Sequence, residues 1–72
     1  MTITATELET RFTYHAPKDD QPTRYVELRE EAHNLATLIV ARTPESREQS
    51  LALTALEEAV FWANAAIARR EP

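Results

Sequence analysis

Two long segments of the chain carry apolar residues at spacings of three and four, the pattern of an amphipathic helix. The first stripe predicts a helix over residues 22–42 and consists of Tyr25, Leu28, Ala32, Leu35 and Ile39. The second predicts a helix over residues 46–70 and consists of Leu53, Leu56, Val60, Ala63 and Ile67. Helices of similar length with a short connector pack antiparallel, stripe against stripe. The sequence therefore predicts an all-α fold, an antiparallel two-helix hairpin in a single domain of residues 1–72.

Proline sets the ends of the predicted helices, because the chain contains no glycine. Pro22 suits the first turn of a helix, and Asp20 or Gln21 can cap that turn. Pro44 ends the first helix, since the residue before a proline avoids helical backbone angles. Ser46, with a glutamine three residues later, has the pattern of a capping box and begins the second helix.

Residues 1–21 form a less regular N-terminal head in this prediction. The run Thr6-Glu7-Leu8-Glu9 can cap one helical turn, whereas Phe12-Thr13-Tyr14-His15 is typical of an extended segment or a turn. Two aromatic rings beside a histidine suit a loop that packs over a partner.

The second predicted helix carries another stripe of mostly small residues, made of Ala52, Ala55, Ala59, Trp62 and Ala66. One partner helix cannot cover both stripes, so we interpret this one as a subunit interface; the alternative is that alanine is present as the best helix former. A chain of 72 residues has a marginal core, and without cysteine it forms no disulfide. The sequence therefore predicts a homo-oligomer.

The charge of the chain limits the ligands that it can bind. A formal net charge of −4 argues against DNA or RNA polymers, whose binding depends on neutralising phosphates. Binding of a small anion is still compatible with the composition, because seven of the eight basic residues are arginine. Arginine contacts phosphate with two parallel hydrogen bonds. Four arginines have no carboxylate three or four residues away: Arg29, Arg47, Arg69 and Arg70. Such arginines can bind phosphate, point into water or pair with another subunit.

Other functional groups are few. Arg47 and Ser50 lie in the predicted first turn of the second helix, where free amide groups favour an anion. Tyr14 offers a flat face for a nucleotide base, or for packing on a neighbouring helix. The two histidines have no serine or second ligand at a useful spacing, so we expect no catalytic set, no metal and no cofactor. The sequence has no long apolar run, so we expect no membrane-spanning segment and no signal peptide.

The order of these motifs resembles the helical-hairpin domain of phage anti-CBASS and Thoeris anti-defence sponges. The resemblance rests on Phe12-Thr13-Tyr14-His15-Ala16-Pro17, on Tyr25 and Arg29, and on the second helix from Ser46 through Trp62-Ala63-Asn64 to Arg69. It implies a homo-oligomer, a hexamer in this family, that acts in the cytoplasm of the infected bacterium. It also implies binding of cyclic di- or trinucleotides, or glyco-cyclic ADP-ribose, without cleavage. The immune effector then stays off.

The resemblance also implies roles for individual residues. Tyr14, next to His15, corresponds to the residue that stacks on a base, and Arg29 to the basic position that meets phosphate. Arg69, with Arg70 as an alternative register, resembles a basic residue of a second pocket where subunits converge. Weaker assignments are Arg47, Ser50 and Asn64. The main alternative is a small oligomeric protein-interaction module that inhibits a host protein.

Overall fold

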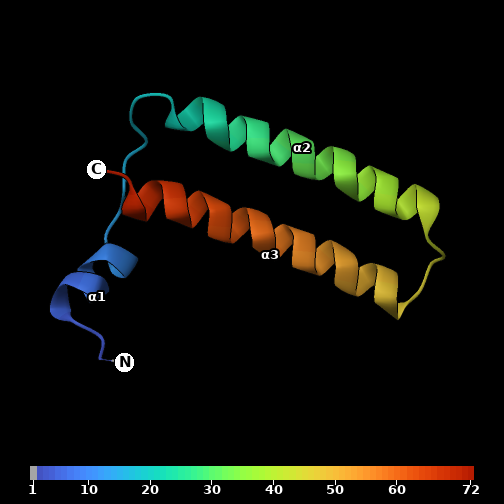
Figure 1. Cartoon of the computed structure of the whole chain (residues 1–72), viewed down its shortest axis with the longest axis horizontal. Coiled ribbons are helices and arrows are strands. Elements are labelled where there is room, and N and C mark those ends of the chain that lie inside the picture. Colours follow the sequence, from blue (N-terminus) through green and yellow to red (C-terminus); the bar gives the residue numbers. More distant parts are fainter. Residues whose placement is uncertain (1) are drawn as a thin grey trace.

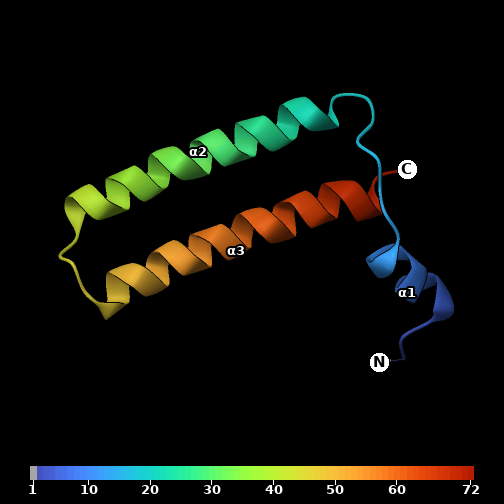
Figure 2. The ribbon, with the colours of Figure 1, turned by 180° about the vertical axis from the view of Figure 1, so that it is seen from behind.

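A computed structural model describes residues 2–72 and contains three helices and no strand in that range. Helix α1 spans Ala5–Phe12, α2 spans Gln21–Arg42 and α3 spans Arg47–Arg70. Helices α2 and α3 run antiparallel, side by side, and α1 lies beside the C-terminal end of α3 (Figure 1). The view from behind shows the same arrangement (Figure 2). The all-helical hairpin expected from the sequence is present.

Local signals determine where the two long helices begin. Ser46 caps α3, because its Oγ accepts a hydrogen bond of 3.1 Å from the backbone N–H of Gln49. The Gln49 side chain does not complete the capping box, since its Nε2 donates instead to the carbonyl oxygen of Thr43. Asp20 occupies the cap position of α2 without a capping hydrogen bond, so the expected side-chain cap is absent there.

The N-terminal head is more helical than the sequence predicted. Helix α1 has eight residues, and its cap is Thr4, whose Oγ1 accepts from the Glu7 N–H at 3.1 Å. The motif Thr4-x-x-Glu7 is a capping-box spacing that the head prediction overlooked. The turn before α2 places Asp19 at a φ of 51°. Aspartate tolerates this left-handed conformation better than most residues, which suits a chain without glycine.

The facing sides of α2 and α3 largely follow the predicted stripes. Nine of the ten stripe residues are half-buried. Leu35 is the exception, with 46% of its surface exposed, and the half-buried position on that turn is Ala36. The prediction for Leu35 was wrong, because Ala36 is the residue that faces α3 on this turn. Ala36 stands four residues after Ala32 and so lies on the same face.

The single chain does not bury a hydrophobic core. No apolar side chain among residues 2–72 is fully buried, and Phe61 and Trp62 are 63% and 70% exposed. The accessible surface is 5937 Å², whereas a compact monomer of this mass exposes about 4,500 Å². The radius of gyration of 15.6 Å likewise exceeds the roughly 11 Å of a compact domain of this length.

Helix α3 is long and apolar enough to cross a membrane by length and composition, contrary to the expectation of no such segment. It carries Glu57 and Glu58 near its middle, and charged residues at the centre of a bilayer are costly. Its apolar stripe faces α2 in the hairpin. We therefore interpret the apolar character of α3 as serving contacts between helices.

Candidate functional site

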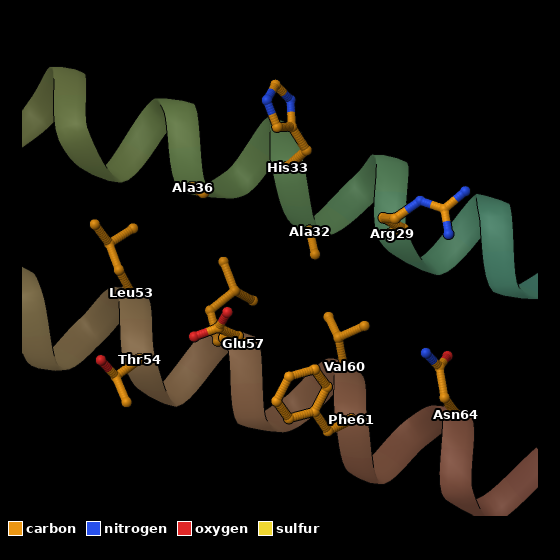
Figure 3. Close-up of a pocket in the computed structure, with 11 residues that line it drawn as sticks. Arg29, Ala32, His33, Ala36, Leu53, Thr54, Glu57, Val60, Phe61 and Asn64 are labelled. Atoms are coloured by element: carbon orange, nitrogen blue, oxygen red, sulfur yellow. The ribbon is translucent and has the colours of Figure 1, made fainter.

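The first concave region is the inter-helix groove, which lies between α2 and α3 and has a volume of about 510 Å³. Its floor is mainly aliphatic, with Leu53 and Val60 pointing from α3 toward α2 (Figure 3). Its polar edge comprises Arg29, His33, Thr54, Glu57 and Asn64. The groove exists because small residues, Ala32 and Ala36, occupy the facing side of α2.

Arg29 of α2 and Asn64 of α3 both line this groove, and their side chains do not contact each other (Figure 3). Arg29 makes no ion pair within residues 2–72. It also lines a smaller hollow on α2, of about 380 Å³, with Glu30, His33 and Asn34. The Oδ1 atom of Asn64 is shielded from solvent and has no hydrogen-bond partner in the described part of the chain. A shielded acceptor without a donor is unfavourable, so a turn of the Asn64 side chain that brings Oδ1 to a donor would be favoured.

The second concave region is the arginine pocket, of about 400 Å³, between α1 and the C-terminal end of α3. It is lined by Arg11, Trp62, Ala65, Ala66, Arg69 and Arg70. Trp62, Ala66 and Arg69 are spaced four and three residues apart, which places them on one face of α3. The pocket thus combines three guanidinium groups with an exposed indole ring, a set suited to phosphate and a nucleotide base.

The carboxylate of Glu7 binds two of these three arginines. Its oxygens lie 2.6 and 3.0 Å from the two terminal nitrogens of Arg70, and Oε1 also accepts from Nε of Arg11 at 3.3 Å. The hydrogen bond from Arg70 holds the pKa of Glu7 down at about 2, and the pair raises the pKa of Arg70. Arg69 has no carboxylate partner among residues 2–72, and its Nη2 lies 3.5 Å from the carbonyl oxygen of Arg11.

The structure distributes the other predicted site residues over separate places. Tyr14 lies between α1 and α2 and is 83% exposed, while Nε2 of His15 lies 2.7 Å from the Thr10 carbonyl oxygen. Arg47 and Ser50 stand at the opposite end of α3 from Arg69, about 33 Å along the helix. One chain therefore does not unite all eight predicted residues in one pocket.

Sequence reasoning missed Glu7 and Arg11 as parts of a site. Their spacing of four residues predicts a local ion pair in a helix, and this signal was available. The contact between Glu7 and Arg70 joins residues 63 positions apart, and no local pattern predicts it. Among the residues that the structure describes, no group of three or more His, Cys, Asp or Glu side chains could hold a metal ion.

Comparison with known proteins gives one match. The family model of the Acb2/Tad1 hairpin domain matches residues 4–68, which include all of α1 and α2 and most of α3. Arg69 and Arg70 follow the matched range directly. No curated protein and no solved structure matches the chain. The match confirms the family resemblance seen in the sequence.

Proposed function

Because the chain belongs to the Acb2/Tad1 hairpin family, the family of anti-CBASS and anti-Thoeris sponges, we propose that it binds cyclic oligonucleotide messengers and does not cleave them. Capture of the messenger keeps the immune effector of the bacterium inactive. The place of action is the cytoplasm of the infected host, where the messenger is made. The observation that carries this proposal is the family match across residues 4–68.

The chemistry of the two concave regions supports a ligand that contains phosphates and bases. A phosphodiester group matches the fork of a guanidinium group, and three arginines line the arginine pocket. A base can stack on an aromatic face, and both Trp62 and Tyr14 are exposed. In the groove, Arg29, which has no ion-pair partner among the described residues, can meet a phosphate. The Asn64 side chain can bind the amino group of a base once it turns Oδ1 out of its shielded position.

We further propose that the working form is a homo-oligomer, a hexamer as in the family. The single chain exposes 5937 Å², about 1,400 Å² more than a compact monomer of its mass, and a standard interface buries about 800 Å² per partner. The predicted interface stripe on α3 includes Trp62 and Ala66, which also line the arginine pocket. A subunit packed on this stripe would lie against the pocket and help to enclose the ligand.

Sequestration needs a slow dissociation rate rather than a chemical step. Calorimetric titration of the purified protein with cyclic dinucleotides, cyclic trinucleotides and glyco-cyclic ADP-ribose tests the proposal. We expect tight binding of at least one of these messengers and no binding of a linear dinucleotide of the same bases. Absence of heat with every messenger would contradict the proposal.

A second candidate function is inhibition of a host protein through the exposed apolar surface. Phe61 and Trp62 are both exposed, on different faces of α3, and exposed aromatic side chains are enriched in interfaces. This function predicts a complex with a different protein and no binding of nucleotides. The same titration therefore distinguishes the two functions.

A further inference from the structure

A carboxylate of the protein itself, that of Glu7, is bound to arginines that line the arginine pocket. The Glu7 carboxylate occupies both terminal nitrogens of Arg70 and contacts Nε of Arg11, so two of the three guanidinium groups are already paired. A phosphate group would need the same nitrogen atoms, because carboxylate and phosphate match the guanidinium fork in the same way. A ligand that uses Arg70 must displace Glu7.

Little apolar contact holds Glu7 in place. Helix α1 has no buried residue, and its large apolar side chains Leu8 and Phe12 are 48% and 83% exposed. In the described part of the chain, the hydrogen bonds between α1 and α3 are those of Glu7 with Arg70 and of Arg69 with the Arg11 carbonyl oxygen. Displacement of the carboxylate therefore costs mainly electrostatic contacts, and these weaken with salt.

The competition depends on the charge of the ligand. A ligand with one phosphate group would only exchange for the carboxylate, which is tethered at an effective concentration in the millimolar range. A ligand with two or three phosphates can contact Arg69, which has no carboxylate partner in the described residues, together with Arg70 or Arg11. Such a ligand makes contacts that Glu7 cannot make.

We propose that Glu7 is an internal competitor that keeps single phosphates out of the arginine pocket and yields to ligands with several phosphates. Glu7 thus determines the specificity of the pocket. Its lowered pKa of about 2 is consistent with this role, since the carboxylate stays charged at neutral pH and is not released by protonation. The link to cyclic oligonucleotides rests on the proposed function, but the competition itself concerns any polyphosphate.

Trp62 is the only tryptophan and lines the pocket, so its fluorescence reports on binding there. The probes are inorganic tripolyphosphate and inorganic phosphate, in low salt. We expect the wild type to bind tripolyphosphate and not phosphate. Glu7→Gln should bind tripolyphosphate about two- to fivefold more tightly, the range expected for loss of a surface ion pair, and should begin to bind phosphate. Glu9→Gln makes the same change of charge on an exposed residue of α1 that has no ion pair among residues 2–72, and it should match the wild type.

Hydrogen exchange of the wild-type protein provides a readout that needs no variant. Tripolyphosphate should accelerate exchange of the α1 amides if it displaces Glu7, whereas attraction to the pocket without displacement leaves α1 protected. Equal affinities of Glu7→Gln and Glu9→Gln, or protection of α1 in the presence of tripolyphosphate, would overturn the inference.

Titration of the same variants with cyclic nucleotides separates this inference from the proposed function. Tighter tripolyphosphate binding by Glu7→Gln without cyclic-nucleotide binding by any variant would refute the function and leave the competition intact. If cyclic nucleotides bind while Glu7→Gln and Glu9→Gln have the same affinity for tripolyphosphate, the function would stand and the competition would be refuted.

Discussion

The guanidinium of Arg24 holds the carboxylate of Glu71 with two hydrogen bonds, of 2.7 and 2.6 Å, across the open end of the hairpin. Gln21, the one buried polar residue among those described, adds a hydrogen bond of 2.9 Å to the same carboxylate and donates to the Ile67 carbonyl oxygen at 3.2 Å. Asp20 lies 3.2 Å from Nε of Arg24 but does not accept a hydrogen bond from it, since that atom has no hydrogen-bond partner. This cluster joins the start of α2 to the end of α3, where no apolar core does so.

Glu71→Gln should lower the melting temperature of the hairpin by roughly 2–5 °C, because it removes the charge that pairs with Arg24 at a partly exposed position. Thermal unfolding followed by circular dichroism measures the change. Glu58→Gln, at an exposed position in the middle of α3 without an ion pair among the described residues, is the matched control and should unfold like the wild type. Equal melting temperatures for both variants would show that the cluster does not stabilise the hairpin.

Acid should weaken two ion pairs, Arg24 with Glu71 and Arg70 with Glu7, in the same pH range. The hydrogen bond from Arg24 lowers the pKa of Glu71 to about 2, and that from Arg70 lowers the pKa of Glu7 to about 2, from an ordinary value of 4.5. A lowered pKa in the folded state contributes stability that is complete above pH 4.5 and is lost as the pH falls from 4.5 toward 2. The melting temperature should therefore decline across this range.

The double variant Glu7→Gln, Glu71→Gln tests the origin of the acid effect. Both carboxylates are absent from it, so its melting temperature should depend less steeply on pH between 4.5 and 2 than that of the wild type. Parallel pH profiles for the two proteins would assign the acid effect to other carboxylates.

The assigned ligand contacts can be tested by truncation. Tyr14→Ala should weaken cyclic-nucleotide binding about 5- to 150-fold, the range for loss of one base stack. Arg29→Ala should also weaken binding, because it removes an unpaired guanidinium from the groove. Neither residue belongs to the predicted interface stripe on α3, so the assembly should stay intact in light scattering. Unchanged affinity in both variants would remove these residues from the site.

Trp62→Ala should lower the oligomeric state, because it removes the largest side chain of the predicted interface stripe. Size-exclusion chromatography with light scattering gives the mass directly. Val40→Ala, which truncates an apolar residue on α2 that is 52% exposed, is the control. A Trp62→Ala protein that keeps the mass of the wild type would contradict the interface.

The parts of the fold that depend on local signals could be predicted from the sequence. Pro22, Pro44 and the Ser46 cap are such signals, and α2 and α3 end within one residue of the ranges that they predict. The start of α1 could have been predicted from Thr4-x-x-Glu7, because this spacing is typical of a helix N-terminus. Leu35 shows that side-chain size misleads where an alanine occupies the facing position.

The parts of the site that depend on distant contacts could not be predicted. The four arginines were judged by carboxylates three or four residues away, and this criterion cannot detect the pairing of Arg70 with Glu7 across 63 residues. The arginine pocket likewise depends on the position of α1, which supplies Arg11, beside α3. Only the recognition of the family connected these residues with a nucleotide ligand, because isolated arginines are compatible with many anions.

The central claim is that the protein binds a messenger and returns it unchanged. The most direct measurement incubates the protein with an equimolar cyclic oligonucleotide that it binds, removes free nucleotide by filtration, denatures the complex by heat and analyses the released nucleotide by chromatography. We predict that nearly all of the nucleotide stays with the protein before heating and elutes afterwards as the intact cyclic compound. Linear or mononucleotide products, or a nucleotide that passes freely through the filter, would contradict the claim.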